Sequence, residues 1–176
     1  MVVEIRFAGS GGQGILTTGV VCANAAMSLG KNVTWYPSYG AEMRGGTANC
    51  SVKIGDQEID SPYLKKVDIL CAMNAPSVAT FQKELKSGAI MFADADALDE
   101  GVEIRDDIKV VRVPVNQIAR SANNPRGANL VMLGALAAHT NLFTVEEIVT
   151  AVEDYFKKKG IDNPKNLDCL RMGAQC

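Results

Sequence analysis

The sequence predicts a three-layer α/β/α sandwich in which helices cover both faces of a mostly parallel, possibly mixed, sheet. Stretches of strand character alternate with helical stretches along the chain, an order that is typical of α/β domains. A glycine-rich loop also joins the first expected strand to the first expected helix, which gives the chain a Rossmann-like start. Because the chain has 176 residues and carries no internal repeat or linker, we expect one α/β domain spanning residues 1–176.

The first third of the chain has the clearest pattern. Apolar and polar residues alternate over 2–8, which predicts a short strand. Residues 15–29 carry a wide apolar stripe, typical of a helix that covers a sheet and ends before Gly30. A second short strand is expected over 33–36.

Two further strands and a helix follow. Alternation over 48–54 predicts a half-buried strand, and the turn residues Gly55 and Asp56 after it indicate a hairpin. The compact apolar run 67–73 fits a buried strand. Proline near its start predicts a helix over 74–88.

The centre of the chain is acidic. Strands are expected over 89–93 and 109–113, separated by an acidic stretch that begins with Asp94 and Asp96. Active sites in α/β proteins often lie after such a strand. A solvated acidic loop is the expectation for these two aspartates.

The last third is helical in pattern. Residues 128–138 are apolar nearly all round, which predicts a helix buried on more than one side. Thr144 and Glu147 have capping-box spacing and open an amphipathic helix that ends near Gly160. Residues 161–176 show no clear period. His139, at the end of a buried helix, is expected to be structural.

Composition excludes several classes of protein. The chain has 47% hydrophobic residues, 22% charged residues and a net charge of −2, and nothing in these values indicates electrostatic binding to nucleic acid or to an anionic membrane. There is no signal-peptide pattern at the N-terminus and no apolar run of ~18 residues. We expect a cytoplasmic protein with neither nucleic-acid nor membrane partners.

The five cysteines are widely scattered and form no C-x-x-C pair, which argues against a disulfide framework and against a zinc or iron–sulfur site within the chain. Cys22 and Cys71 lie in apolar runs and are expected to be small core residues.

The glycine loop is the first candidate site. Its residues are Gly9, Ser10, Gly11, Gly12, Gln13 and Gly14. Glycines fit G-x-G-x-x-G between a strand and a helix, where backbone N–H groups can approach a phosphate closely. Gln13 could add an amide contact. The alternative is that the glycines only make a tight turn.

A dinucleotide site would need an acidic residue for the ribose at the end of the second strand. Residues 35–38 are Trp-Tyr-Pro-Ser, so NAD is disfavoured.

The second candidate site is the loop from Tyr39 to Gly46. Glu42 and Arg44 lie two residues apart, so in an extended chain both side chains project from one face. Arg44 could clamp a carboxylate or phosphate, held by Glu42, and Tyr39 could stack or hydrogen-bond. The alternative is an exposed ion pair in a flexible loop.

Residues 9–14, followed by residues 39–46, resemble the gamma subunits of 2-oxoacid:acceptor (ferredoxin) oxidoreductases, the enzymes that act on pyruvate, 2-oxoglutarate or ketoisovalerate. Residues 129–136 are similar to the same family, and the resemblance covers residues 1–158. The two glycine motifs are specific together, whereas neither is alone. They also occur in indolepyruvate oxidoreductases, so they leave the 2-oxoacid open.

The resemblance implies a multi-subunit enzyme. In it thiamine diphosphate attacks the 2-oxoacid, carbon dioxide leaves, electrons pass through iron–sulfur clusters to ferredoxin, and coenzyme A takes the acyl group. Other subunits, of alpha, beta and delta type, would carry thiamine diphosphate and the clusters, and this chain alone would bind none of these cofactors. The chain would resemble catalytic domain III of the family, without catalytic residues of its own.

What the resemblance assigns to this chain is subunit contact and coenzyme A contact. The candidate binding or interface positions are Gly9, Ser10, Gly11, Gly12, Gln13, Gly14, Tyr39, Glu42, Arg44, Gly45 and Gly46. Two other hypotheses stay open: a stand-alone nucleotide- or CoA-binding Rossmann-like protein, and an NAD-dependent enzyme.

Overall fold

The computed structural model describes residues 1–39, 46–99 and 101–176 of the chain. Within them, six strands form one sheet in the order β2-β3-β1-β4-β5-β6. The strands are β1 (Val2–Ser10), β2 (Asn32–Tyr39), β3 (Thr47–Gly55), β4 (Val67–Ala72), β5 (Leu85–Asp94) and β6 (Lys109–Val113). The helices are α1 (Ile15–Ser28), α2 (Ala75–Phe81), α3 (Ala95–Asp99), α4 (Val115–Ser121), α5 (Ala128–His139), α6 (Val145–Lys158) and α7 (Lys165–Gly173), with 3-10 turns η1 (Gln82–Glu84) and η2 (Pro125–Gly127).

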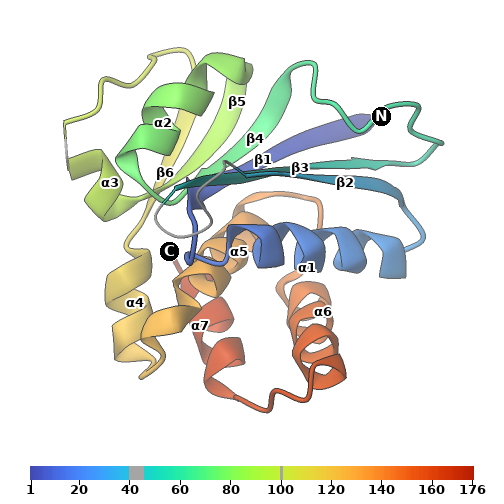
Figure 1. Ribbon diagram of the computed structural model, residues 1–176, viewed down its shortest axis with the longest axis vertical. Coiled ribbons are helices and arrows are strands. Elements are labelled where there is room, and N and C mark those ends of the chain that lie inside the picture. Colours follow the sequence, from blue (N-terminus) through green and yellow to red (C-terminus); the bar gives the residue numbers. More distant parts are fainter. Residues whose placement is uncertain (40–45, 100) are drawn as a thin grey trace.

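Helices cover both faces of the sheet. Figure 1 shows α1, α5, α6 and α7 beneath it and α2 and α3 above it. Strands β1, β4, β5 and β6 form a parallel block, and β3 is antiparallel to both of its neighbours. The predicted three-layer fold with a mostly parallel, mixed sheet is confirmed.

The Rossmann-like start differs from the expectation in one respect. In a Rossmann unit the first two strands pair, but here β3 lies between β1 and β2. The antiparallel pair is β2 and β3, so the prediction of a hairpin that turns at Gly55 and Asp56 is wrong. After Gly55 the chain crosses through residues 56–66 to β4, on the other side of β1.

β3 was expected to be half-buried, but it lies between β2 and β1 and is buried on both faces. One face packs Ala48, Cys50, Val52 and Ile54 into the main core. The polar face is buried as well, because Lys53 is only 5% exposed. Its ammonium lies 3.3 Å from Glu4 Oε1 and donates to the carbonyl oxygens of Ser61 and Tyr63 at 3.1 and 2.7 Å. The segment 56–66 thereby covers a buried charge that is fully paired.

Tertiary contacts override the pattern at two places in the middle of the chain. The helix expected over 74–88 is shorter, since α2 and η1 end at Glu84 and β5 begins at Leu85. Gly88 lies inside β5 with φ +76°, and its N–H donates to Asp107 O at 2.7 Å. The glycine therefore marks an irregularity in the strand and not the end of a helix.

The helical third follows the prediction more closely. α5 is buried over residues 129–137, and the capping box of Thr144 and Glu147 opens α6. On α1, Met27 belongs to the apolar stripe predicted over residues 15–29 but is 61% exposed. Helices α3, α4 and α7 were not predicted. Among the described residues no helix is both long enough and apolar enough to cross a membrane.

Candidate functional site

The glycine loop lies where the sheet changes direction of winding. β1 and β4 are parallel neighbours, but β1 leads into α1 on one face and β4 into α2 on the other (Figure 1). In open α/β sheets, ligands bind outside the carboxyl ends of the strands at such a switch point. The loop from Gly9 to Gly14 occupies this position, and residues 73–75 form the opposite side.

Glycine is required at two positions of this loop by the backbone itself. Gly12 has φ +94° and Gly14, the N-cap of α1, has φ +74°. Both values lie in the region that residues with a Cβ rarely adopt. Gly12 is exposed, and a Cβ there would meet no atom within 4 Å. The backbone at Gly12 is thus open to an approaching group.

Two other contacts of the loop are internal. A Cβ on Gly9 would lie 2.6 Å from Gln13 Oε1 and 2.7 Å from Ile15 Cδ1. A Cβ on Gly14 would lie 2.5 Å from Asn129 Nδ2, the amide that also donates to Gly14 O at 3.3 Å. Close packing accounts for glycine at these two positions without any ligand.

The Gln13 side chain closes the loop. Its Oε1 accepts from Ser10 N–H at 2.7 Å, and its Nε2 donates to Met73 O at 3.0 Å. Both ends of the amide are therefore engaged within the protein, which ties the loop to the end of β4. A contact between this amide and a ligand would require one of these bonds to open.

Asn74, which sequence analysis did not single out as a site residue, links the two sides of the switch point. Its Oδ1 accepts from Ser77 N–H at 2.9 Å as the N-cap of α2, and its Nδ2 donates to Ser10 Oγ at 2.7 Å. The capping position before Pro76 could be predicted from sequence, but the partner Ser10 depends on the pairing of β1 with β4.

The two glycine motifs meet in space. Gly11 N–H donates to Gly46 O at 2.8 Å, which places the end of the second motif against the turn of the first. Tyr39 pairs with Ala48 through the β2–β3 ladder, and its backbone alone is described. Glu42, Arg44 and Gly45 lie outside the described residues.

The family model described as pyruvate ferredoxin/flavodoxin oxidoreductase matches residues 4–176. The chain belongs to this family.

Three relatives show the range of this oxidoreductase family. The ketoisovalerate oxidoreductase subunit VorA of Methanothermobacter thermautotrophicus is 39% identical over 178 residues, covering 98% of this chain and 36% of VorA. The keto/oxoacid ferredoxin oxidoreductase gamma subunit of Geobacter sulfurreducens has a TM-score of 0.83 and 27% identity, with 99% and 95% coverage. The 2-oxoglutarate:ferredoxin oxidoreductase of Magnetococcus marinus, solved with 2-oxoglutarate, coenzyme A and succinyl-CoA bound, has a TM-score of 0.88 and 27% identity, covering 99% of this chain and 30% of that one. The chain thus spans about a third of the length of the VorA protein that it matches.

Beside the glycine loop, this oxidoreductase-family chain carries an acidic cluster at the end of β5. Asp94 is 3% exposed, so the expectation of a solvated loop is wrong for it. Asn116 Nδ2 donates to Asp94 Oδ2 at 3.1 Å and to Asp96 Oδ2 at 3.0 Å. The amide bridges the two carboxylates and connects β5 to α4.

All five cysteines of this chain are free, and four of them are buried. Cys22 and Cys71 are core residues, as predicted. Burial raises the pKa of Cys50 to about 12 and also raises the pKa of Cys22 and Cys71 above its ordinary value. At neutral pH these thiols are protonated and unreactive.

His139 makes structural contacts. Its Nε2 lies 2.7 Å from Cys176 O, and its ring stands edge-on to Phe92 with centroids 6.1 Å apart. The first contact ties Cys176 to the end of α5 and the second packs the ring against β5, which fits the structural role expected from sequence.

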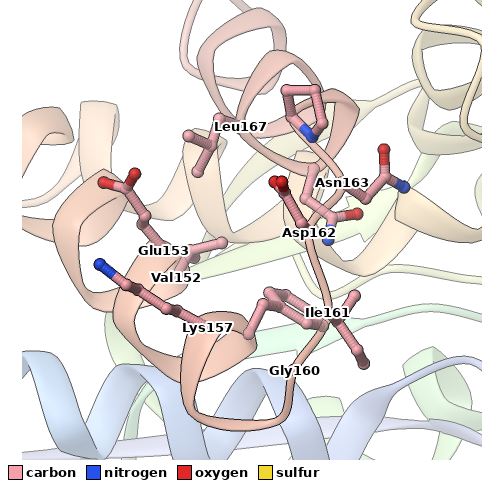
Figure 2. A pocket seen from close by; sticks show the side chains of 11 residues that line it. Val152, Glu153, Lys157, Gly160, Ile161, Asp162, Asn163 and Leu167 are labelled. Atoms are coloured by element: carbon pink, nitrogen blue, oxygen red, sulfur yellow. The ribbon is translucent and has the colours of Figure 1, made fainter.

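A pocket of about 430 Å³ lies between α6 and α7, apart from the glycine loop (Figure 2). Val152, Phe156 and Leu167 supply apolar lining, and Glu153, Lys157 and Asp162 add charges of both signs. This mixture selects no single class of ligand.

Proposed function

We propose that the chain is the gamma-type subunit of a multi-subunit 2-oxoacid:ferredoxin oxidoreductase and forms one α/β domain of it. The complex would convert a 2-oxoacid and coenzyme A into an acyl-CoA and carbon dioxide, while two electrons pass to ferredoxin. The observation that carries the proposal is the meeting of the two glycine motifs at the switch point, through Gly11 N–H and Gly46 O, in a chain of this family.

Within the complex, we propose that the chain contributes coenzyme A or phosphate contacts and a subunit interface. The candidate positions are Gly9, Ser10, Gly11, Gly12, Gln13, Gly14, Tyr39, Glu42, Arg44, Gly45 and Gly46. The open backbone at Gly12 fits the close approach of a phosphate, whereas Gly9 and Gly14 shape the loop. Coenzyme A bound to the Magnetococcus marinus relative supports this choice of ligand.

The catalytic cofactors belong, in this proposal, to the other subunits. Iron–sulfur clusters are held by thiolates. Cys22, Cys50 and Cys71 are protonated and enclosed in the core, so they do not fit cluster ligands. Thiamine diphosphate and the clusters would therefore lie in alpha-, beta- and delta-type partners, through which ferredoxin is also reached. Five free cysteines suit a reduced cytoplasm.

A stand-alone nucleotide- or CoA-binding protein is the second candidate. The lengths of two relatives argue against it, because the region similar to this chain is 36% of VorA and 30% of the Magnetococcus marinus protein. A domain that forms part of a longer oxidoreductase chain in relatives is expected to work with partners.

Affinity purification of the tagged chain from its own source under anaerobic conditions tests the proposal. We expect co-purifying subunits, iron and thiamine diphosphate in the assembly, and oxidation of at least one of pyruvate, 2-oxoglutarate or ketoisovalerate. The chain expressed alone should be colourless and free of iron. Purification of the tagged chain without partners would favour the stand-alone protein, and stoichiometric iron in the lone chain would contradict our assignment of the cysteines.

A further inference from the structure

A second pocket, of about 320 Å³, lies on the upper face of the sheet near the start of β4. It is bounded by the end of the 56–66 segment and by η1, and four cationic side chains and one carboxylate line it: Arg6, Lys65, Lys66, Lys83 and Glu84. Arg6 precedes Ser10 by four residues of β1, a distance of ~13 Å along a strand. The pocket is therefore separate from the glycine loop, toward the opposite ends of the strands.

Arg6 forms a fixed wall of this pocket. Its Nε and Nη2 both donate to Glu84 Oε2, at 3.1 and 2.7 Å, and its Nη1 donates to Asn49 Oδ1 at 2.8 Å. The guanidinium also lies 5.0 Å from the centre of the Phe81 ring. Because Arg6 compensates the charge of Glu84, the positive charge of the pocket comes from the three lysines.

These lysines differ from the paired lysines of the chain. Lys31, Lys53 and Lys86 each form an ion pair with a carboxylate. Over the residues that the structure describes, no ion pair joins Lys65, Lys66 or Lys83 to an acid. All three lysines are exposed and line the same pocket, so their like charges repel one another across it.

The backbone beneath two of the lysines is held firmly. The N–H groups of Lys65 and Lys66 donate to Glu4 Oε2 at 2.7 and 3.0 Å, and Glu4 is itself 8% exposed and paired with Lys53. The positions at which these lysines leave the backbone are therefore set by a buried network. An anion between the side chains would relieve their repulsion without rearranging the fold.

We propose that this pocket binds a phosphate-type oxyanion, either free phosphate or the phosphate group of a small molecule. Lysine ammonium groups bind phosphate through charge-assisted hydrogen bonds. The volume is at the lower end of the ~300–1,000 Å³ range of ligand pockets, which suits a small ligand. Because the chain as a whole carries a net charge of −2, positive charge confined to a pocket favours a small anion over an extended polyanion.

Titration of the full chain with inorganic phosphate tests the site, with sodium chloride at equal ionic strength as the reference and amide NMR signals as the readout. We expect saturable shifts at residues 64–67 and 83–84. The triple variant Lys65→Gln, Lys66→Gln, Lys83→Gln should bind phosphate at least ~10-fold more weakly. The matched variant Lys109→Gln, Lys158→Gln, Lys165→Gln removes three exposed lysines elsewhere that form no ion pair within the described part of the chain, and it should stay within about twofold of wild type.

A parallel titration with adenosine monophosphate separates the two sources of the anion. Tighter binding of the nucleotide than of phosphate at the same signals would indicate a carried phosphate group, and equal affinity would indicate a free one. Equal weakening by the two triple variants, shifts confined to residues 9–14, or no response beyond the chloride reference would each overturn the proposal.

Discussion

Gly12 and Gly30 both need the positive φ that glycine adopts readily, but they lie in different parts of the chain. Both have positive φ, and a Cβ on either would meet no atom within 4 Å, but Gly12 lies in the glycine loop and Gly30 follows α1. Gly12→Ala and Gly30→Ala should each lower the free energy of unfolding by about 1–2 kcal/mol, measured by urea denaturation.

The two substitutions should differ in their effect on coenzyme A binding. If the backbone at Gly12 approaches coenzyme A, Gly12→Ala should raise the KM for coenzyme A of the assembled complex at least about tenfold, whereas Gly30→Ala should leave it unchanged. Identical KM values in the two variants would show that the glycine loop serves only as a tight turn and does not contact coenzyme A.

The role of Arg44 is predicted from sequence alone, because Arg44 lies outside the described residues. An exposed ion pair contributes ~0–1 kcal/mol, whereas truncating one member of a buried charged contact costs about 2–5 kcal/mol. We expect Arg44→Ala to leave the Tm of the lone chain nearly unchanged while weakening assembly or raising the KM for coenzyme A at least ~10-fold. Arg44→Lys should rescue only in part, because lysine lacks the planar fork. Wild-type assembly and coenzyme A titration in Arg44→Ala would remove this residue from the site.

At the scale of single elements, α7 shows why part of the helical layer escaped prediction. α5 and α7 cross at Gly134 and Gly173: a Cβ on Gly134 would overlap Leu170 O, and a Cβ on Gly173 would overlap Val131 O. The backbones approach too closely for any side chain between them. The buried face of α7 consists of Asn166, Cys169, Leu170 and Gly173. Because one of these residues is polar and one is glycine, the apolar pattern over 161–176 is too sparse to predict a helix.

Gly134→Ala should consequently destabilise the protein strongly. Backbone atoms cannot move aside as a flexible side chain can, so we expect a loss of about 3 kcal/mol or more by urea denaturation. Gly160→Ala is the control, because Gly160 needs its positive φ but has open space around it, and its cost should stay near 1 kcal/mol. A Gly134→Ala variant as stable as Gly160→Ala would show that the helices do not cross as described.

Elements with a local signal were predictable, and those set by distant partners were not. The capping box of Thr144, the apolar α5 and the glycine loop each carry their pattern within a few residues. The insertion of β3 between β1 and β2 depends on long-range pairing that no local pattern encodes. The same holds for the site: glycine at 12 and 14 could be expected, but the contacts of Asn74 with Ser10 and of Asn129 with Gly14 join segments 64 and 115 residues apart.

At the scale of the whole molecule, we propose that the chain provides shape and contacts for chemistry that occurs in partner subunits. Its sheet presents the glycine loop at one end and a cluster of lysines toward the other, while four of its five thiols are buried. If the chain has this role, neither the chain nor its partner subunits alone carry out the reaction.

Coenzyme A-dependent reduction of a viologen dye by a 2-oxoacid, measured on the chain alone, on the partner subunits alone and on the reconstituted assembly, tests this most directly. We predict activity in the reconstituted assembly and essentially none in either part. Dye reduction by the lone chain would contradict the absence of a catalytic centre, and full activity of the partners without it would contradict its contribution to coenzyme A binding and assembly.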